Sequence, residues 1–65
     1  MTHDERFDMT HAMAVYGGSF VRALAVCFLT ADGTNLQKLE QTFPKEVAQY
    51  QDMGKILKER EHVDN

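Results

Sequence analysis

The fold is decided by one stretch of the sequence, residues 16–31, which reads YGGSFVRALAVCFLTA. Apolar residues recur within it at helical spacing, as in Phe20, Leu24 and Phe28, and this periodicity predicts a helix over 19–31. We expect Ser19 to be the N-cap, since a serine hydroxyl accepts a hydrogen bond from a free backbone N–H at a helix start. We also expect the two glycines before it to end the preceding helix by taking the left-handed conformation.

The predicted helix over 19–31 is apolar nearly all round, with Arg22 as its only charged residue. Such a helix must be covered on more than one side. The whole chain has 65 residues, and a domain of this size buries only about 60 % of the surface that it exposes when unfolded. Cys27 is the single cysteine, which excludes an internal disulfide and a multi-thiolate zinc site as additional support. The sequence therefore predicts that self-association, as a homo-oligomer, completes the core.

The segment before the glycines has one apolar stripe. Met9, Met13 and Tyr16 are spaced i, i+4 and i+7, with Phe7 and Ala14 beside them. This spacing predicts a helix over 2–16.

The segment after residue 31 contains two helices on either side of a proline. Either Asp32 or Thr34 caps the first of them, over 34–43, and Thr34 with Gln37 also fits a capping box. Because the residue before proline avoids the helical region while proline itself begins a helix well, Pro44 opens the last one, over 44–61. Its inward positions are Val47, Tyr50 and either Met53 or the pair Gly54 and Leu57, so whether this helix continues past Gly54 stays open.

These segments define one all-α domain over residues 1–65. It is a helical bundle of three to four short helices, over 2–16, 19–31, 34–43 and 44–61, with residues 1–4 and 62–65 frayed.

The charge balance disfavours nucleic acid as a partner, and the length of the longest apolar stretch disfavours a membrane. Seven basic and ten acidic residues give a net charge of −3, whereas a nucleic-acid binder usually has a basic face. The longest apolar stretch contains Arg22 and is about half the length that spans a bilayer. With no visible signal peptide and one free thiol, we expect a cytoplasmic protein.

No catalytic, cofactor-binding or metal-binding set can be assembled from the sequence. His3, His11 and His62 have no second ligand type at i+4, and we expect His11 to be a partly exposed helical histidine. Cys27 has no basic neighbour at helical spacing to activate it, so we expect a buried, inert thiol. Residues 17–19 lack the lysine of a phosphate-binding loop and the second glycine of a nucleophile elbow. We therefore predict a protein that is not an enzyme.

The two helices around residues 32–35 also fit a helix-turn-helix, which makes a small dimeric DNA-binding or regulatory protein the alternative function. Its recognition helix would carry Lys38 beside Glu40 and no arginine to read guanine. A dimer would have to build its basic face from six side chains: Arg22, Lys38, Lys45, Lys55, Lys58 and Arg60.

The pattern Y-G-G-S-F-V at 16–21, followed by A-D at 31–32, F-P at 43–44 and a closing Tyr50, resembles short uncharacterised proteins of bacteriophages and integrated mobile elements. Those proteins often have proline after the Ala-Asp pair, where this chain has Gly33. The resemblance carries no functional residues. It implies a small accessory protein in the cytoplasm of a host cell.

The sequence thus favours a non-enzymatic protein–protein interaction module that inhibits or modulates a host protein. Aromatic residues and flexible methionines suit interfaces. The candidate interaction residues are Met13, Tyr16, Tyr50 and Met53.

Overall fold

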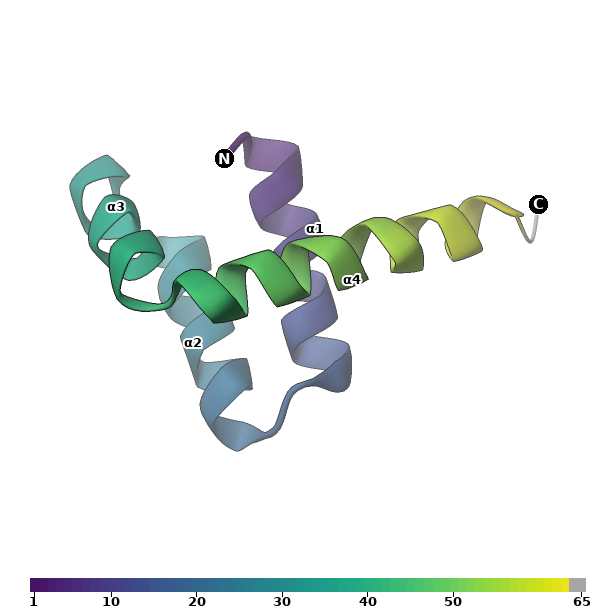
Figure 1. The fold of residues 1–65 in the computed structure, drawn as a ribbon, viewed down its shortest axis with the longest axis horizontal. Helices are drawn as coiled ribbons and strands as arrows, with labels where there is room; N and C mark the ends of the chain where they lie inside the picture. The colour runs from purple at the N-terminus through teal and green to yellow at the C-terminus, as the bar shows by residue number, and fades with distance from the viewer. Residues whose placement is uncertain (64–65) are drawn as a thin grey trace.

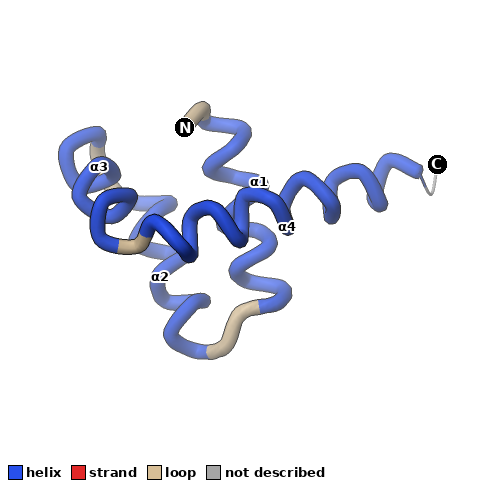
Figure 2. The backbone as a smooth tube through the Cα atoms, viewed as in Figure 1, coloured by secondary structure: helices blue, strands red, loops and turns tan. Residues whose placement is uncertain are grey.

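A computed structural model describes residues 1–63, and these form four α-helices and no strand. The helices are α1 (His3–Tyr16), α2 (Ser19–Thr30), α3 (Gly33–Thr42) and α4 (Pro44–Val63) (Figure 2). The all-α prediction is confirmed, with boundaries within two residues of those expected. α4 continues through Gly54 without a break.

The helices are arranged around a crossing between α1 and α4. α1 packs extensively against both α2 and α4, whereas α3 makes only sparse contacts with α4. In Figure 1, α4 lies across α1, and its C-terminal half extends beyond the other helices. The molecule is elongated as a result, measuring 37 × 24 × 19 Å.

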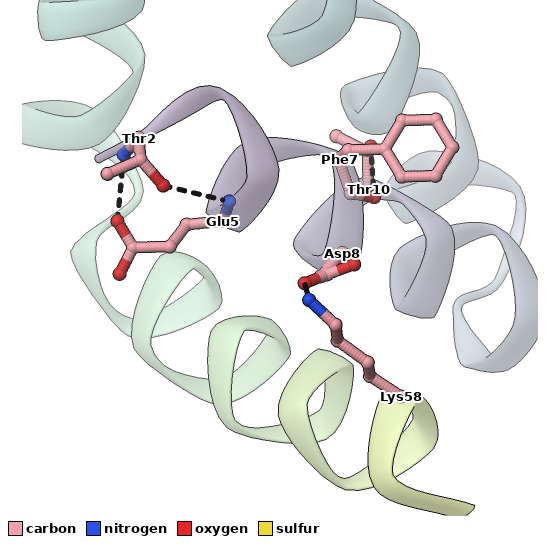
Figure 3. Close-up of polar contacts among 6 residues, drawn as sticks. All are labelled: Thr2, Glu5, Phe7, Asp8, Thr10 and Lys58. Atoms are coloured by element: carbon pink, nitrogen blue, oxygen red, sulfur yellow. Dashed lines mark hydrogen bonds and ion pairs between the residues drawn. The ribbon is translucent and has the colours of Figure 1, made fainter. Parts of the chain in front are cut away.

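The start of α1 is fixed by a capping box. The Thr2 hydroxyl accepts a hydrogen bond from the Glu5 backbone N–H at 3.1 Å, and the Glu5 carboxylate accepts one from the Thr2 N–H at 2.7 Å (Figure 3). This arrangement pairs two of the backbone groups that a helix start leaves open. The hydrogen-bonded helix start thus includes Thr2, and the fraying expected for residues 1–4 stays a prediction. At the other end, the backbone is helical through Val63, and residues 64–65 lie outside the described part of the chain.

The starts of α2 and α3 differ in how they are capped. Gly18, not Ser19, is the N-cap of α2, and no side chain caps that end, so the prediction for Ser19 is wrong. Asp32 caps α3 by accepting a hydrogen bond from the Asn35 backbone N–H at 2.9 Å. Because Asp32 takes the cap, Thr34 lies inside the helix and the capping box predicted for it does not form.

Gly17 ends α1 for a steric reason. Its φ is −82°, and no glycine in the described residues has a positive φ, so the left-handed ending predicted for it is wrong. A Cβ at this position would lie 2.5 Å from the Met13 carbonyl oxygen and against the Val21 side chain. Glycine is needed here because α1 and α2 turn closely around it.

The core lies where α1, α2 and α4 meet. Its fully buried side chains include Phe28, Met9 and Met13. The buried apolar residues come from all three helices: Met9, Ala12, Met13, Leu24, Ala25, Phe28 and Tyr50. Partly buried residues of α3 and α4, among them Leu39 and Val47, pack against this cluster.

Two polar side chains at the core, Thr10 and Arg6, are hydrogen-bonded to backbone carbonyl groups. The Thr10 hydroxyl donates within its own helix to the carbonyl oxygen of Arg6, at 2.9 Å. It also donates to that of Phe7, at 3.0 Å (Figure 3). The Arg6 guanidinium reaches from α1 to the C-terminal end of α2, where it donates to the carbonyl oxygens of Phe28 and Ala31. In the described residues, no buried side-chain nitrogen or oxygen lacks a partner.

Candidate functional site

The four residues predicted for interaction divide into two groups. Met13 and Tyr50 belong to the core, so neither is available on the surface of the single chain. Tyr16, at the end of α1, is 49 % exposed, and Met53 is partly buried. These two lie together with Ile56 and Arg60 around a shallow pocket of about 180 Å³ between α1 and α4.

Several large apolar side chains of α2 are exposed. Leu24, Ala25 and Phe28 face inward, but Phe20, Val26 and Leu29 are 62 %, 58 % and 50 % exposed. Together with Ala23 and Cys27, which are also exposed, these residues form what we call the outer face of α2. Arg22 is the only charged side chain along this helix.

The outer face of α2 is exposed because α3 does not fold back over it. No residue of α3 is buried, and this helix touches the body through the partly buried Leu36 and Leu39. Phe20 stays at the rim, where its ring centroid is 6.1 Å from that of Phe43. The chain therefore leaves the apolar side of one helix in contact with solvent.

The total surface agrees with an open arrangement. The accessible area is 4588 Å². A compact monomer of 7.4 kDa is expected to have about 4200 Å².

Cys27 is exposed, so the prediction of a buried thiol is wrong. It lines an open groove of about 530 Å³ between α2 and α3, together with the apolar side chains of Leu39 and Phe43. Lys38 is the charged residue at this groove. The sequence pattern placed Cys27 near Leu24 and Phe28, but the inward side of α2 is centred on Phe28 and Ala25 and leaves Cys27 outside.

A second pocket, of about 250 Å³, lies where α4 crosses α1. Phe7, Asp8 and His11 line it from α1, and Gly54 and Lys58 line it from α4. The Lys58 ammonium nitrogen lies 3.6 Å from an Asp8 carboxylate oxygen (Figure 3). Both side chains are partly exposed, so this ion pair fixes the crossing only weakly. His11 is exposed, as expected.

Glu5, at the start of α1, has a shifted pKa. The pKa of Glu5 is lowered below its ordinary value, chiefly because its carboxylate accepts the Thr2 backbone N–H and the Thr2 side chain adds a second hydrogen bond. This carboxylate serves as a helix cap, and it lines a small pocket of about 20 Å³ together with Asp8, Gln51 and Lys55.

The described residues bring together no group of three or more His, Cys, Asp or Glu side chains that could hold a metal ion. Among the helices that the structure describes, none has both the length and the apolar character needed to cross a membrane. The six basic side chains proposed for a DNA-binding face are spread over α2, α3 and α4, and Lys58 is paired with Asp8.

Comparison of the chain with models of protein families, with curated proteins and with solved structures finds no match.

Sequence reasoning identified α2 as the helix with too much apolar surface, but it placed the interaction residues elsewhere. The sequence predicts that self-association covers this helix, but Phe20, Val26 and Leu29 were not among the four candidate interaction residues. The absence of any charge other than Arg22 was the signal that could have assigned them to a contact surface.

Proposed function

We propose that this chain is a non-enzymatic protein–protein interaction module whose binding surface is the outer face of α2. The single observation that carries the proposal is the exposure of Phe20, Val26 and Leu29 on a helix with one charge. Contiguous exposed apolar patches are rare on monomeric proteins and mark interaction sites when they are large. Burying the exposed part of each contributes about 1 kcal/mol to binding.

The proposal extends to the setting in which the module acts. The resemblance to bacteriophage and mobile-element proteins supports an accessory role in the cytoplasm of a host cell, as an inhibitor or modulator of a host protein. A small acidic helical protein can occlude a site on a partner without any chemistry of its own. The shallow pocket between α1 and α4, which Tyr16 and Met53 line, is a second contact region, separate from the outer face of α2.

Photo-cross-linking tests this function directly. A benzophenone amino acid replaces Val26 on α2 and, as a matched control, Gln49, which is exposed on α4. On irradiation in the cells that express the chain, position 26 is expected to give protein adducts and position 49 none. Adducts at position 26 should also be lost when Leu29→Asp is added, because a charge in the contact surface must be desolvated.

The absence of any protein adduct from position 26 would overturn the proposal. A DNA-shift assay at two salt concentrations tests the alternative, since binding that weakens steeply with salt is the signature of phosphate contacts. We expect no shift at either concentration.

A further inference from the structure

We draw no further inference here: the strongest candidate, the open groove between α2 and α3 that Cys27 and Lys38 line beside the outer face of α2, rests on an unpartnered apolar surface, and nothing in the structure shows what covers it.

Discussion

Gly54 of α4 lies directly against the backbone of Asp8 in α1. A Cβ at Gly54 would be 2.6 Å from the Asp8 carbonyl oxygen and 3.1 Å from the Met9 backbone nitrogen. Atoms at these distances overlap, so the helix–helix crossing requires a residue without a side chain at this position. The crossing in turn brings Tyr50 into the core, one turn before Gly54.

Gly54→Ala is expected to lower the free energy of unfolding by about 2 kcal/mol. Alanine favours a helix by about 1 kcal/mol over glycine, but the clash is with rigid backbone, and overpacking of this kind costs about 1–3 kcal/mol or more. Urea unfolding followed by circular dichroism measures the difference. Gly33→Ala is the control, since a Cβ there meets no atom within 4 Å, and it should leave stability equal or slightly higher. Equal stability of the two variants would contradict the close approach.

Arg6→Met is expected to destabilise the fold by about 1 kcal/mol. Arg6 is partly buried and donates to the carbonyl oxygens of Phe28 and Ala31, at 3.5 and 3.3 Å, at an end of α2 that has no basic residue of its own. Hydrogen bonds from a charged group stabilise by about 1.5–3 kcal/mol, and these are long ones. Thermal unfolding compares this variant with Arg60→Met, an exposed arginine on α4. If the two variants have the same melting temperature, the Arg6 hydrogen bonds contribute nothing to stability.

Tyr50→Ala and Tyr16→Ala should affect different properties. Tyr50 is 8 % exposed and belongs to the core, so its loss is expected to cost about 3 kcal/mol of stability. Tyr16 is 49 % exposed, so its replacement should cost less than about 1 kcal/mol. Chemical denaturation of the two variants checks the contrast. A stable Tyr50→Ala variant that loses only binding would show that this tyrosine acts at a contact surface instead.

The capping box predicts an effect of pH. Because hydrogen bonds from Thr2 hold the pKa of Glu5 below its ordinary value of 4.5, ionised Glu5 stabilises the native state above pH 4.5. This contribution is lost as the pH falls from 4.5 through the lower pKa of the folded state. An NMR titration of the Glu5 carboxyl carbon should report the lowered pKa. Thr2→Ala removes the hydroxyl but keeps the backbone N–H, which is the larger cause, so it should move the pKa only part of the way back toward 4.5. Thr42→Ala, on the distant α3, should leave the pKa unchanged, and a Glu5 pKa that Thr2→Ala does not raise at all would contradict the contribution of the Thr2 side chain.

Much of the secondary structure was predictable because its signals are local. Pro44 disfavours the helical conformation at the residue before it, so one helix ends and the next begins there. Phe43 has a non-helical φ of −124° as a result. Asp32 offers its carboxylate to a backbone N–H three residues on, which depends on nothing outside the turn. At residues 17–19 the break was predicted but its mechanism was not, because the clash of Gly17 with Val21 exists only when two helices already pack.

The sequence by itself indicated an all-α chain of three to four helices, one of which has more apolar surface than a short chain can cover. Helical periodicity, caps and breakers act within a few residues, so they can be recognised without knowing what packs where. Only the tertiary structure decided which side of α2 faces inward, since Phe20, Leu24 and Cys27 share a stripe and the crossing of α1 and α4 buries Leu24 alone. It also decided that Gly54 is a contact point and not a break, because the same glycine that weakens an isolated helix allows two helix backbones to touch.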